Sequence, residues 1–185
     1  MPTEQEIITH TKKWIRDVVI ACNFCPFANK VVKQNAVHYE VTFLDNEKSC
    51  LATLLAALKM LDATPSIDTA IMIIPNGFES FLQYLDLTHL AERSLKKNGY
   101  DGIYQIASFH PLYLFAGSKD SDPANYTNRS PYPMLHVLRE ESIDKALEHH
   151  ANPEAIPTTN IAFAKEKGLV YFQMLRDSCM DVNNI

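Results

Sequence analysis

The residue types that can do chemistry concentrate in one stretch of the chain, residues 108–140. The part between 117 and 130 is polar and longer than the roughly 4–6 residues that a simple connection needs, and long loops are usually either functional or disordered. An apolar run leads into this loop and prolines follow it, so we interpret it as an ordered loop that builds a site. The candidate site residues within the stretch are His110, Asp122, Asn128, Arg129, Ser130, Tyr132, His136 and Arg139.

Two histidines in this stretch are candidates for proton transfer. His110 directly follows a predicted strand over 102–109 and precedes Pro111. Strand ends and the loops after them are favoured positions for sites in α/β domains. A histidine there, like His136 further on, can act as a general base or a metal ligand, or it can be a partly buried residue whose ring nitrogens are satisfied internally.

Cys25 is the candidate nucleophile. It opens the run Cys-Pro-Phe-Ala, and Pro26 suits the first position of a short helix of which Cys25 would be the N-cap. The positive end of a helix dipole lowers a thiol pKa and favours the reactive thiolate. Alternatively, Cys25 has only a structural role, as a small side chain that packs under the turn. Cys22 has the spacing of a redox partner, but it closes the apolar stripe of the first helix and is expected to be structural.

The arginines suggest an anion site. Pro131 and Pro133 suit the first turn of a helix that we predict from about 130 to 139 or 149. An arginine just before a helix start, as Arg129 would be, makes a natural seat for phosphate or carboxylate. Arg139 would share a helical face with the histidine three residues earlier. Both arginines can instead form internal salt bridges. The predicted anion-binding set is Arg129, Arg139, Asn128, Ser130, Tyr132 and Asp122.

Hydrophobic periodicity predicts the elements that must position these side chains. Strand, helix, strand, helix and strand follow one another, which favours a layered α/β (or α+β) domain with a short three- to four-stranded sheet flanked by helices. We assign residues 1–168 to a single domain and 169–185 to a C-terminal segment with a frayed tail. The predicted helices are 3–22, 46–61, 78–97 and 159–167, and the predicted strands are 37–43, 69–74, 102–109 and 112–115. Thr3 and Glu6 form a capping box for the first helix, and Asp45 with Asn46 can cap the second. Residues 169–176 carry no clear signal for helix or strand.

Composition excludes several classes of protein. The chain has 185 residues, 46% of them hydrophobic, and a formal net charge of -5, which argues against a general nucleic-acid binder. No apolar run approaches the ~20 residues of a membrane-spanning helix, so no membrane partner is expected. The acidic N-terminus differs from a signal peptide, and four cysteines in an intracellular chain are best interpreted as thiols. We therefore expect a cytoplasmic protein; the sequence leaves its oligomeric state open.

Three motifs in order resemble one known family. They are CPFA at 25–28, QIASFHPLYLFAG at 105–117 and NRSPYPMLHVLRE at 128–140. Together they are similar to the DUF1415 family of bacterial proteins of unknown function, over a span from the Trp14 helix to about Gly168. The first family motif, NLCPFA, carries over to residues 23–28 and leaves Cys22 outside. The resemblance implies a cytoplasmic bacterial protein, and it supplies no reaction.

Three functional hypotheses remain open at this point. One is a thiol-dependent enzyme that uses Cys25 with His110 or His136 on a small anionic substrate held by the arginines. Another is a non-catalytic protein that binds an anion or metabolite. The third is a metal site built from the same cysteine and histidines, with Asp122 as a further candidate ligand, because these side chains suit zinc or iron. The sequence assigns no cofactor. We expect Cys25, His110, Arg129 and His136 to line one pocket, and the enzyme and metal hypotheses both require Cys25 and His110 to lie close together.

Overall fold

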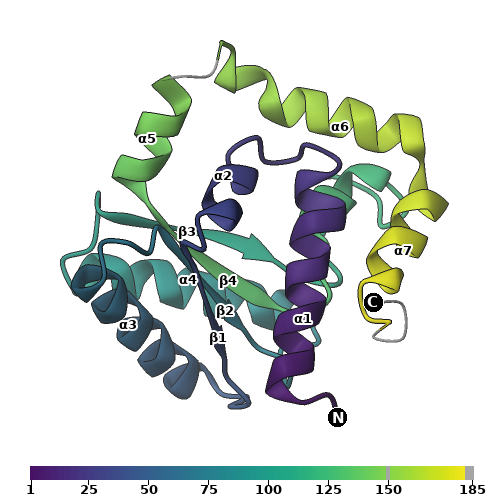
Figure 1. The fold of residues 1–185 in the computed structure, drawn as a ribbon. Coiled ribbons are helices and arrows are strands. Elements are labelled where there is room, and N and C mark those ends of the chain that lie inside the picture. Colours follow the sequence, from purple (N-terminus) through teal and green to yellow (C-terminus); the bar gives the residue numbers. More distant parts are fainter. Residues whose placement is uncertain (149–150, 182–185) are drawn as a thin grey trace.

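A four-stranded mixed sheet organises the chain (Figure 1). The computed structural model describes residues 1–148 and 151–181. The strands lie in the order β1-β2-β4-β3, with β1 parallel to β2 and β4 antiparallel to both its neighbours. The predicted α/β domain with a short sheet flanked by helices is confirmed. The strands are β1 Val37–Val41, β2 Thr69–Ile73, β3 Tyr104–Phe109 and β4 Met134–Arg139.

Helices α3 (Glu47–Ala63) and α4 (Phe81–Lys97) cover one face of the sheet. Asn46 caps α3 by accepting a hydrogen bond from the Ser49 N–H group, as the sequence predicts. Because successive strand side chains point to opposite faces, alternate residues of β2 and β4 enter this layer. The strand residues buried on this face are Ala70, Met72, Leu135 and Val137, together with Tyr104 of β3.

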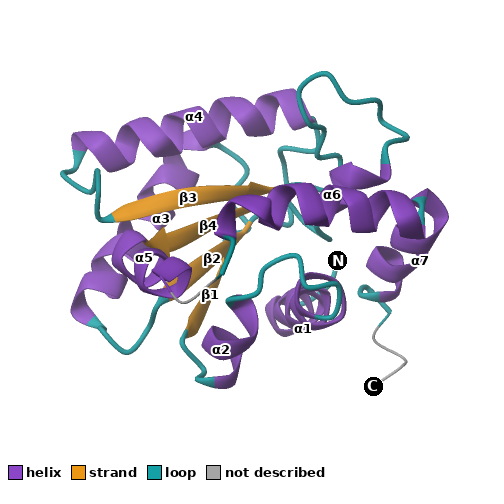
Figure 2. Cartoon of the chain, turned by 90° about the horizontal axis from the view of Figure 1, so that it is seen from above, coloured by secondary structure: helices purple, strands orange, loops and turns teal. Residues whose placement is uncertain are grey.

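The opposite face is covered by the N-terminal and C-terminal helices. These are α1 (Glu4–Trp14), which continues as a π-helical turn over Ile15–Ile20, and α6 (Ile156–Lys167) with α7 (Leu169–Ser178). Figure 2 shows α1 and α4 on opposite sides of the strands. The predicted capping box at Thr3 and Glu6 starts α1. Shorter helical elements are α2 Ala28–Lys33, η2 Pro123–Thr127, α5 Glu140–Glu148 and η3 Pro153–Ala155.

The predicted helix after Pro133 is wrong, because residues 134–139 form the inner strand β4 and a helix begins only at Glu140. A residue before proline is restricted to extended backbone, so the two prolines lead into a strand. Leu135 and Val137 are buried on the α3–α4 face and Met134 on the other. A strand that is covered on both faces lacks polar alternation and is easily mistaken for a helix.

The predicted strand over 112–115 is also absent from the structure; this stretch is a set of turns in which the Tyr113 N–H donates to the His110 carbonyl. Residues 169–176, which the sequence left ambiguous, belong to α7. Phe172 and Cys179 are buried in the same core as α1, so this C-terminal segment packs against the rest of the domain. Residues 182–185 of the predicted frayed tail lie outside the described part. Among the described residues, no helix has the length and apolarity needed to cross a membrane.

Candidate functional site

A cavity of about 290 Å³ lies on the α1 face of the molecule, next to the end of β3. It is formed by the end of the π-helical turn, the CPFA segment, the last residue of β3, the loop after it, the end of η2 and the start of α6. Residues from all three family-like motifs therefore meet here. The lining residues are Val19, Phe24, Cys25, Phe109, Phe115, Thr127, Asn128, Pro157, Asn160 and Ile161.

The chain reverses sharply to bring Cys25 into this wall. The Ala21 N–H donates to the Arg16 carbonyl, five residues back, which is the π-helical pattern. Asn23 then adopts a left-handed conformation with φ of 53°, which asparagine tolerates better than most residues. This turn buries Phe24 in the core and leaves Cys25 partly exposed at the cavity. The π-helical turn, which supplies Val19 to the lining, was not predicted from the sequence.

The predicted capping role of Cys25 is wrong. Helix α2 begins at Ala28 with Phe27 at its N-cap position, and the Cys25 carbonyl instead accepts a hydrogen bond from the Ala28 N–H within a separate turn. The ring of Pro26 supplies no N–H group that a cap could bind. Helix α2 has six residues. Activation of the thiol by a helix dipole therefore has no structural basis.

The other three thiols lie inside the core. Cys22, Cys50 and Cys179 are at most 8% exposed. Burial raises the pKa of the Cys22 thiol, and burial is also the main cause that raises the pKa of Cys50 and of Cys179 to about 11. All four cysteines are free. Since the thiolate is the reactive species and must be reached by a reagent, the structure singles out Cys25 by its access to solvent.

His110 lies on the other side of the sheet from Cys25. Its ring packs against Phe81 and Tyr84 of α4, with ring centroids 5.3 and 4.9 Å away. Nδ1 accepts a hydrogen bond from the Leu112 N–H (2.9 Å), so Nε2 carries the proton and donates to the Phe78 carbonyl (2.8 Å). Burial lowers the pKa of His110. Its two nitrogens hold the backbone, and the proposed pairing with Cys25 is wrong.

His136 lies in β4 and faces the α1 layer, opposite Ile71 and Ala107 in the neighbouring strands. The Thr69 hydroxyl donates to the Val137 carbonyl (2.5 Å), so His136 must donate through Nε2 to Thr69 Oγ1 (2.6 Å). Burial lowers the pKa of His136 to about 4, so the ring is neutral at pH 7. Its ring centroid is 6.1 Å from that of Phe109, which lines the cavity, but His136 does not line it.

Arg129 is only 4% exposed, and its side chain binds other residues of the same long loop. Its Nε donates to the Tyr113 carbonyl (3.0 Å), and one terminal nitrogen donates to the carbonyl (3.2 Å) and the carboxylate (2.6 Å) of Asp120. The guanidinium also lies over the Tyr126 ring, 4.9 Å from its centroid. The predicted anion seat at a helix start is wrong here, because a strand follows and the guanidinium binds the protein itself.

Arg139 has an equally internal role, on the α3–α4 face. Its guanidinium donates to the Ile67 carbonyl (3.1 Å), to the Tyr104 hydroxyl (2.8 Å) and to the Leu61 carbonyl in the last turn of α3. Strand alternation points it away from His136, so the predicted shared helical face does not exist. The alternative predicted for Arg139 was a salt bridge; the arginine instead binds two backbone carbonyls and a hydroxyl, and no ion pair of Arg139 is found among the described residues.

The remaining predicted anion ligands mostly hold the loop. Ser130 Oγ donates to the Tyr132 carbonyl (2.5 Å), and the Tyr132 hydroxyl contacts His10 Nδ1 (2.7 Å). Asp122 caps η2 by accepting from the Ala124 N–H (2.9 Å). Asn128 donates to the Ser108 carbonyl (3.3 Å), and it also lines the cavity.

The structure thus brings together two of the predicted site residues, Cys25 and Asn128, and it directs the other predicted residues to separate internal contacts. Among the described residues, no group of three or more histidine, cysteine, aspartate or glutamate side chains is placed to hold a metal ion, so Cys25, His110 and His136 do not form the suggested ligand set. Sequence reasoning missed Asn160, which α6 brings across the cavity; an isolated polar residue within a predicted helix carries no signal of this.

Comparison with protein families matches the family described as "Protein of unknown function (DUF1415)" over residues 6–174. Searches of curated proteins and of solved structures returned no match. The family match covers nearly the whole chain, including every lining residue of the cavity. The chain therefore belongs to the DUF1415 family.

Proposed function

We propose that this protein binds a small molecule in the Cys25 cavity and presents the Cys25 thiol to it. The observation that supports this most directly is the convergence of the three family-like motifs, which supply Cys25, Phe109 with Phe115, and Asn128 to one wall. A volume of about 290 Å³ lies near the lower end of the ~300–1,000 Å³ that is usual for ligand pockets. We also propose a reducing compartment such as the cytoplasm, since all four cysteines are free.

Binding without catalysis is the form of this proposal that the lining favours. Among the described residues, the lining has no carboxylate, histidine, lysine or arginine, so none of these lining side chains can take up or supply the proton of a thiol reaction. A covalent role for Cys25 then depends on the intrinsic reactivity of the thiol and on the ligand.

Residue-resolved alkylation with iodoacetamide at pH 7.5 tests the proposal. Cys25 should be modified fastest, because the other three thiols are buried. His110→Gln should leave this rate unchanged, since His110 lies across the sheet. A variant that fills the cavity, Ile161→Trp, should slow the modification of Cys25 at least about tenfold, whereas Val170→Trp, a matched change at a residue of α7 that is 65% exposed, should not. Modification of Cys25 more slowly than the other thiols would refute the proposal.

A further inference from the structure

The described residues that line the Cys25 cavity are all uncharged, and this restricts what the cavity can bind. Its polar side chains are Cys25, Thr127, Asn128 and Asn160, and the rest are apolar. Two arginines lie elsewhere in the fold with their guanidinium groups bound to backbone carbonyls. An ionised ligand that enters such a cavity loses its hydration without gaining a counter-ion, which costs several kcal/mol. The cavity therefore selects against anions and cations.

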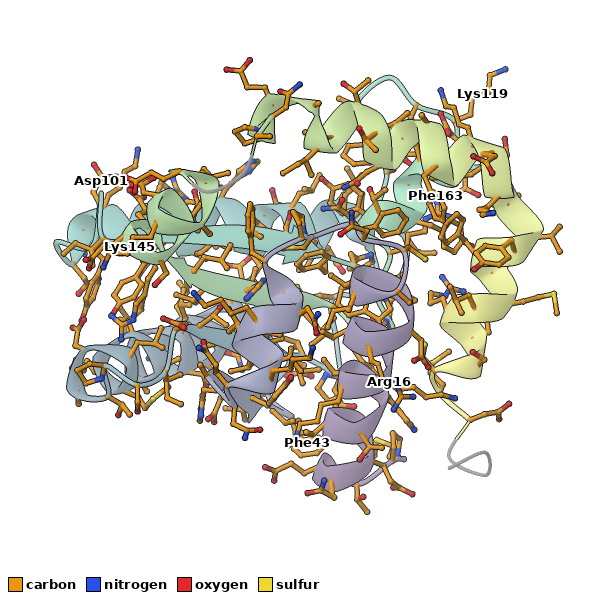
Figure 3. All side chains as sticks on the ribbon, turned by 45° about the horizontal axis from the view of Figure 1, so that its top comes forward. Arg16, Phe43, Asp101, Lys119, Lys145 and Phe163 are labelled. Atoms are coloured by element: carbon orange, nitrogen blue, oxygen red, sulfur yellow. The ribbon has the colours of Figure 1, made fainter. Side chains whose placement is uncertain are left out.

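Aromatic rings form a large part of the wall. Phe24, Phe109 and Phe115 come from three different segments and meet at the cavity. Phe24 is held from behind by Phe163 of α6, which Figure 3 labels, and by Phe172 of α7, with ring centroids 6.1 and 5.6 Å away. Phe109 is held edge-on against Trp14 at 5.2 Å. Rings fixed in this way favour a flat partner, because aromatic pairs gain energy beyond the area that they bury.

Asn160 offers the cavity a hydrogen-bond acceptor. Its Nδ2 donates to the Phe24 carbonyl (2.7 Å), and a carbonyl can only accept, so the orientation of the amide is set. The other amide atom, Oδ1, has no hydrogen-bond partner among the described residues, and it is not fully buried. In Asn128, by comparison, Nδ2 donates to the Ser108 carbonyl, and Oδ1 lies 2.9 Å from the Thr127 hydroxyl, whose one proton it shares with the Ala124 carbonyl (2.9 Å).

From these three features we infer that the ligand class of this cavity is a small uncharged aromatic molecule with an N–H or O–H donor, which it directs at Asn160 Oδ1. This inference rests on the proposed function of the cavity and names its specificity. Asn160 is the specificity-determining residue, and Cys25 lies beside the bound ring.

Three probes of nearly equal shape test the inference. Benzamide is neutral and carries an N–H donor, acetophenone is neutral without a donor, and benzoate is an anion. Their affinities are measured by ligand-observed NMR on Cys25→Ser, which excludes thiol chemistry, and by protection of Cys25 from iodoacetamide in the wild type. We expect benzamide to bind at least about tenfold more tightly than benzoate, because of the cost of burying the charge.

The hydrogen bond between the ligand and Asn160 is tested by comparing the affinities of two probes. The benzamide-to-acetophenone affinity ratio should fall several-fold in Asn160→Ala, as the loss of one hydrogen bond worth about 1 kcal/mol implies. Acetophenone reports whether the cavity itself survives the substitution, and the neighbouring exposed Thr159→Ala serves as the matched control. An unchanged ratio overturns the role of Asn160.

The outcomes also separate this inference from the proposal on which it rests. If benzoate binds as tightly as benzamide, the inference that the ligand is uncharged is overturned. If the aliphatic amide hexanamide protects Cys25 as well as benzamide does, the inference that the ligand is aromatic is overturned. Protection by none of the probes, with Cys25 still the fastest thiol and still slowed by Ile161→Trp, overturns the inference and leaves the proposed function standing. Slow alkylation of Cys25 would overturn both.

Discussion

At the scale of single residues, the polar side chains of the 108–140 stretch divide by what their atoms already bind. His110 uses both ring nitrogens on backbone groups, and Arg129 uses its guanidinium on two carbonyls and a carboxylate. A side chain that is satisfied in this way stabilises the loop and has little left to offer a ligand. Cys25 and Asn160 differ, because each keeps an atom available at the cavity.

Arg129→Lys should lower the free energy of unfolding by about 1–3 kcal/mol, because lysine cannot contact the Tyr113 carbonyl, the Asp120 carbonyl and the Asp120 carboxylate at once. Asp120→Asn should cost at most about 1 kcal/mol, since the Asp120 side chain is 86% exposed. Thermal melting with and without 50 mM sulfate measures both effects. If Arg129 bound an anion, sulfate would raise the melting temperature of the wild type and fail to do so in Arg129→Lys; we expect equal shifts.

His136 gives the protein a pH-dependent stability. Its pKa is about 4 in the folded protein against an ordinary value of 6.5, so between these values the unfolded chain binds more protons. The contribution to stability is therefore complete above pH 6.5 and is lost as the pH falls toward 4. The full difference between these two pKa values corresponds to about 3 kcal/mol of unfolding free energy. Because His136 is partly exposed, the loss of stability should be smaller than this.

Chemical denaturation at pH 7.0, 6.0, 5.0 and 4.5 measures this dependence. His136→Gln retains a donor for Thr69 but cannot be protonated, so its stability should fall less steeply over this range. His10 and His110 also have lowered pKa values from burial and remain in the variant, so a residual slope of the same sign is expected. Identical slopes in the two proteins would contradict the assignment to His136.

At the scale of elements, strand β4 matters most for how the molecule is built. It lies between β2 and β3, sends Leu135 and Val137 into one layer and Met134 and His136 into the other, and ends in Arg139. That arginine binds the last turn of α3 through the Leu61 carbonyl and the connection to β2 through the Ile67 carbonyl. The strand thus fixes the helix end that packs beside it.

Arg139→Ala should release the end of α3 from the sheet. Two backbone carbonyls and the Tyr104 hydroxyl lose their donor, and we expect a loss of stability of about 2–4 kcal/mol. Hydrogen exchange should quicken over residues 61–68 and remain unchanged in α1 and at the cavity. Faster exchange around Cys25 in this variant would show that the two faces of the sheet are coupled more closely than their separate clusters indicate.

At the scale of the whole molecule, the two ends of the chain form one layer. Phe172 of α7 packs against Phe24, Phe163 and Tyr126, and Trp14 of α1 donates to the Arg129 carbonyl (3.1 Å). The cavity lies within this layer, so its shape depends on helices from both termini. The segment after residue 168 supplies no lining residue, but it supports the cavity through the contact between Phe172 and Phe24.

Phe172→Ala should therefore destabilise the whole domain by about 3–5 kcal/mol, as large-to-small changes in a core do. Met174→Ala in the same helix should cost less than about 0.5 kcal/mol, because Met174 is 70% exposed. Far-UV and near-UV circular dichroism should follow a single transition in both variants. A separate early transition in Phe172→Ala would instead support a C-terminal segment that folds apart from residues 1–168.

The sequence by itself determined the elements with a strong local signal. The capping box at Thr3, the Asn46 cap and the long periodic helices are local properties of the chain, and the structure has them close to where they were expected. The alternating strand predicted over 37–43 is present as β1, but it ends at Val41. The sequence failed at β4, where burial on both faces removed the periodicity, and at Cys25, where proline was interpreted as a helix start.

Only the tertiary structure decided which side chains face one another. Phe109 and His110 are neighbours in sequence, yet one lines the cavity and the other packs against α4, because successive strand residues point to opposite faces. Arginine and histidine can equally bind a ligand or a backbone carbonyl, and the carbonyls that occupy His110, Arg129 and Arg139 come from distant turns. The position of those turns is a property of the packed molecule, so residue type alone could not separate the cavity lining from the supports of the fold.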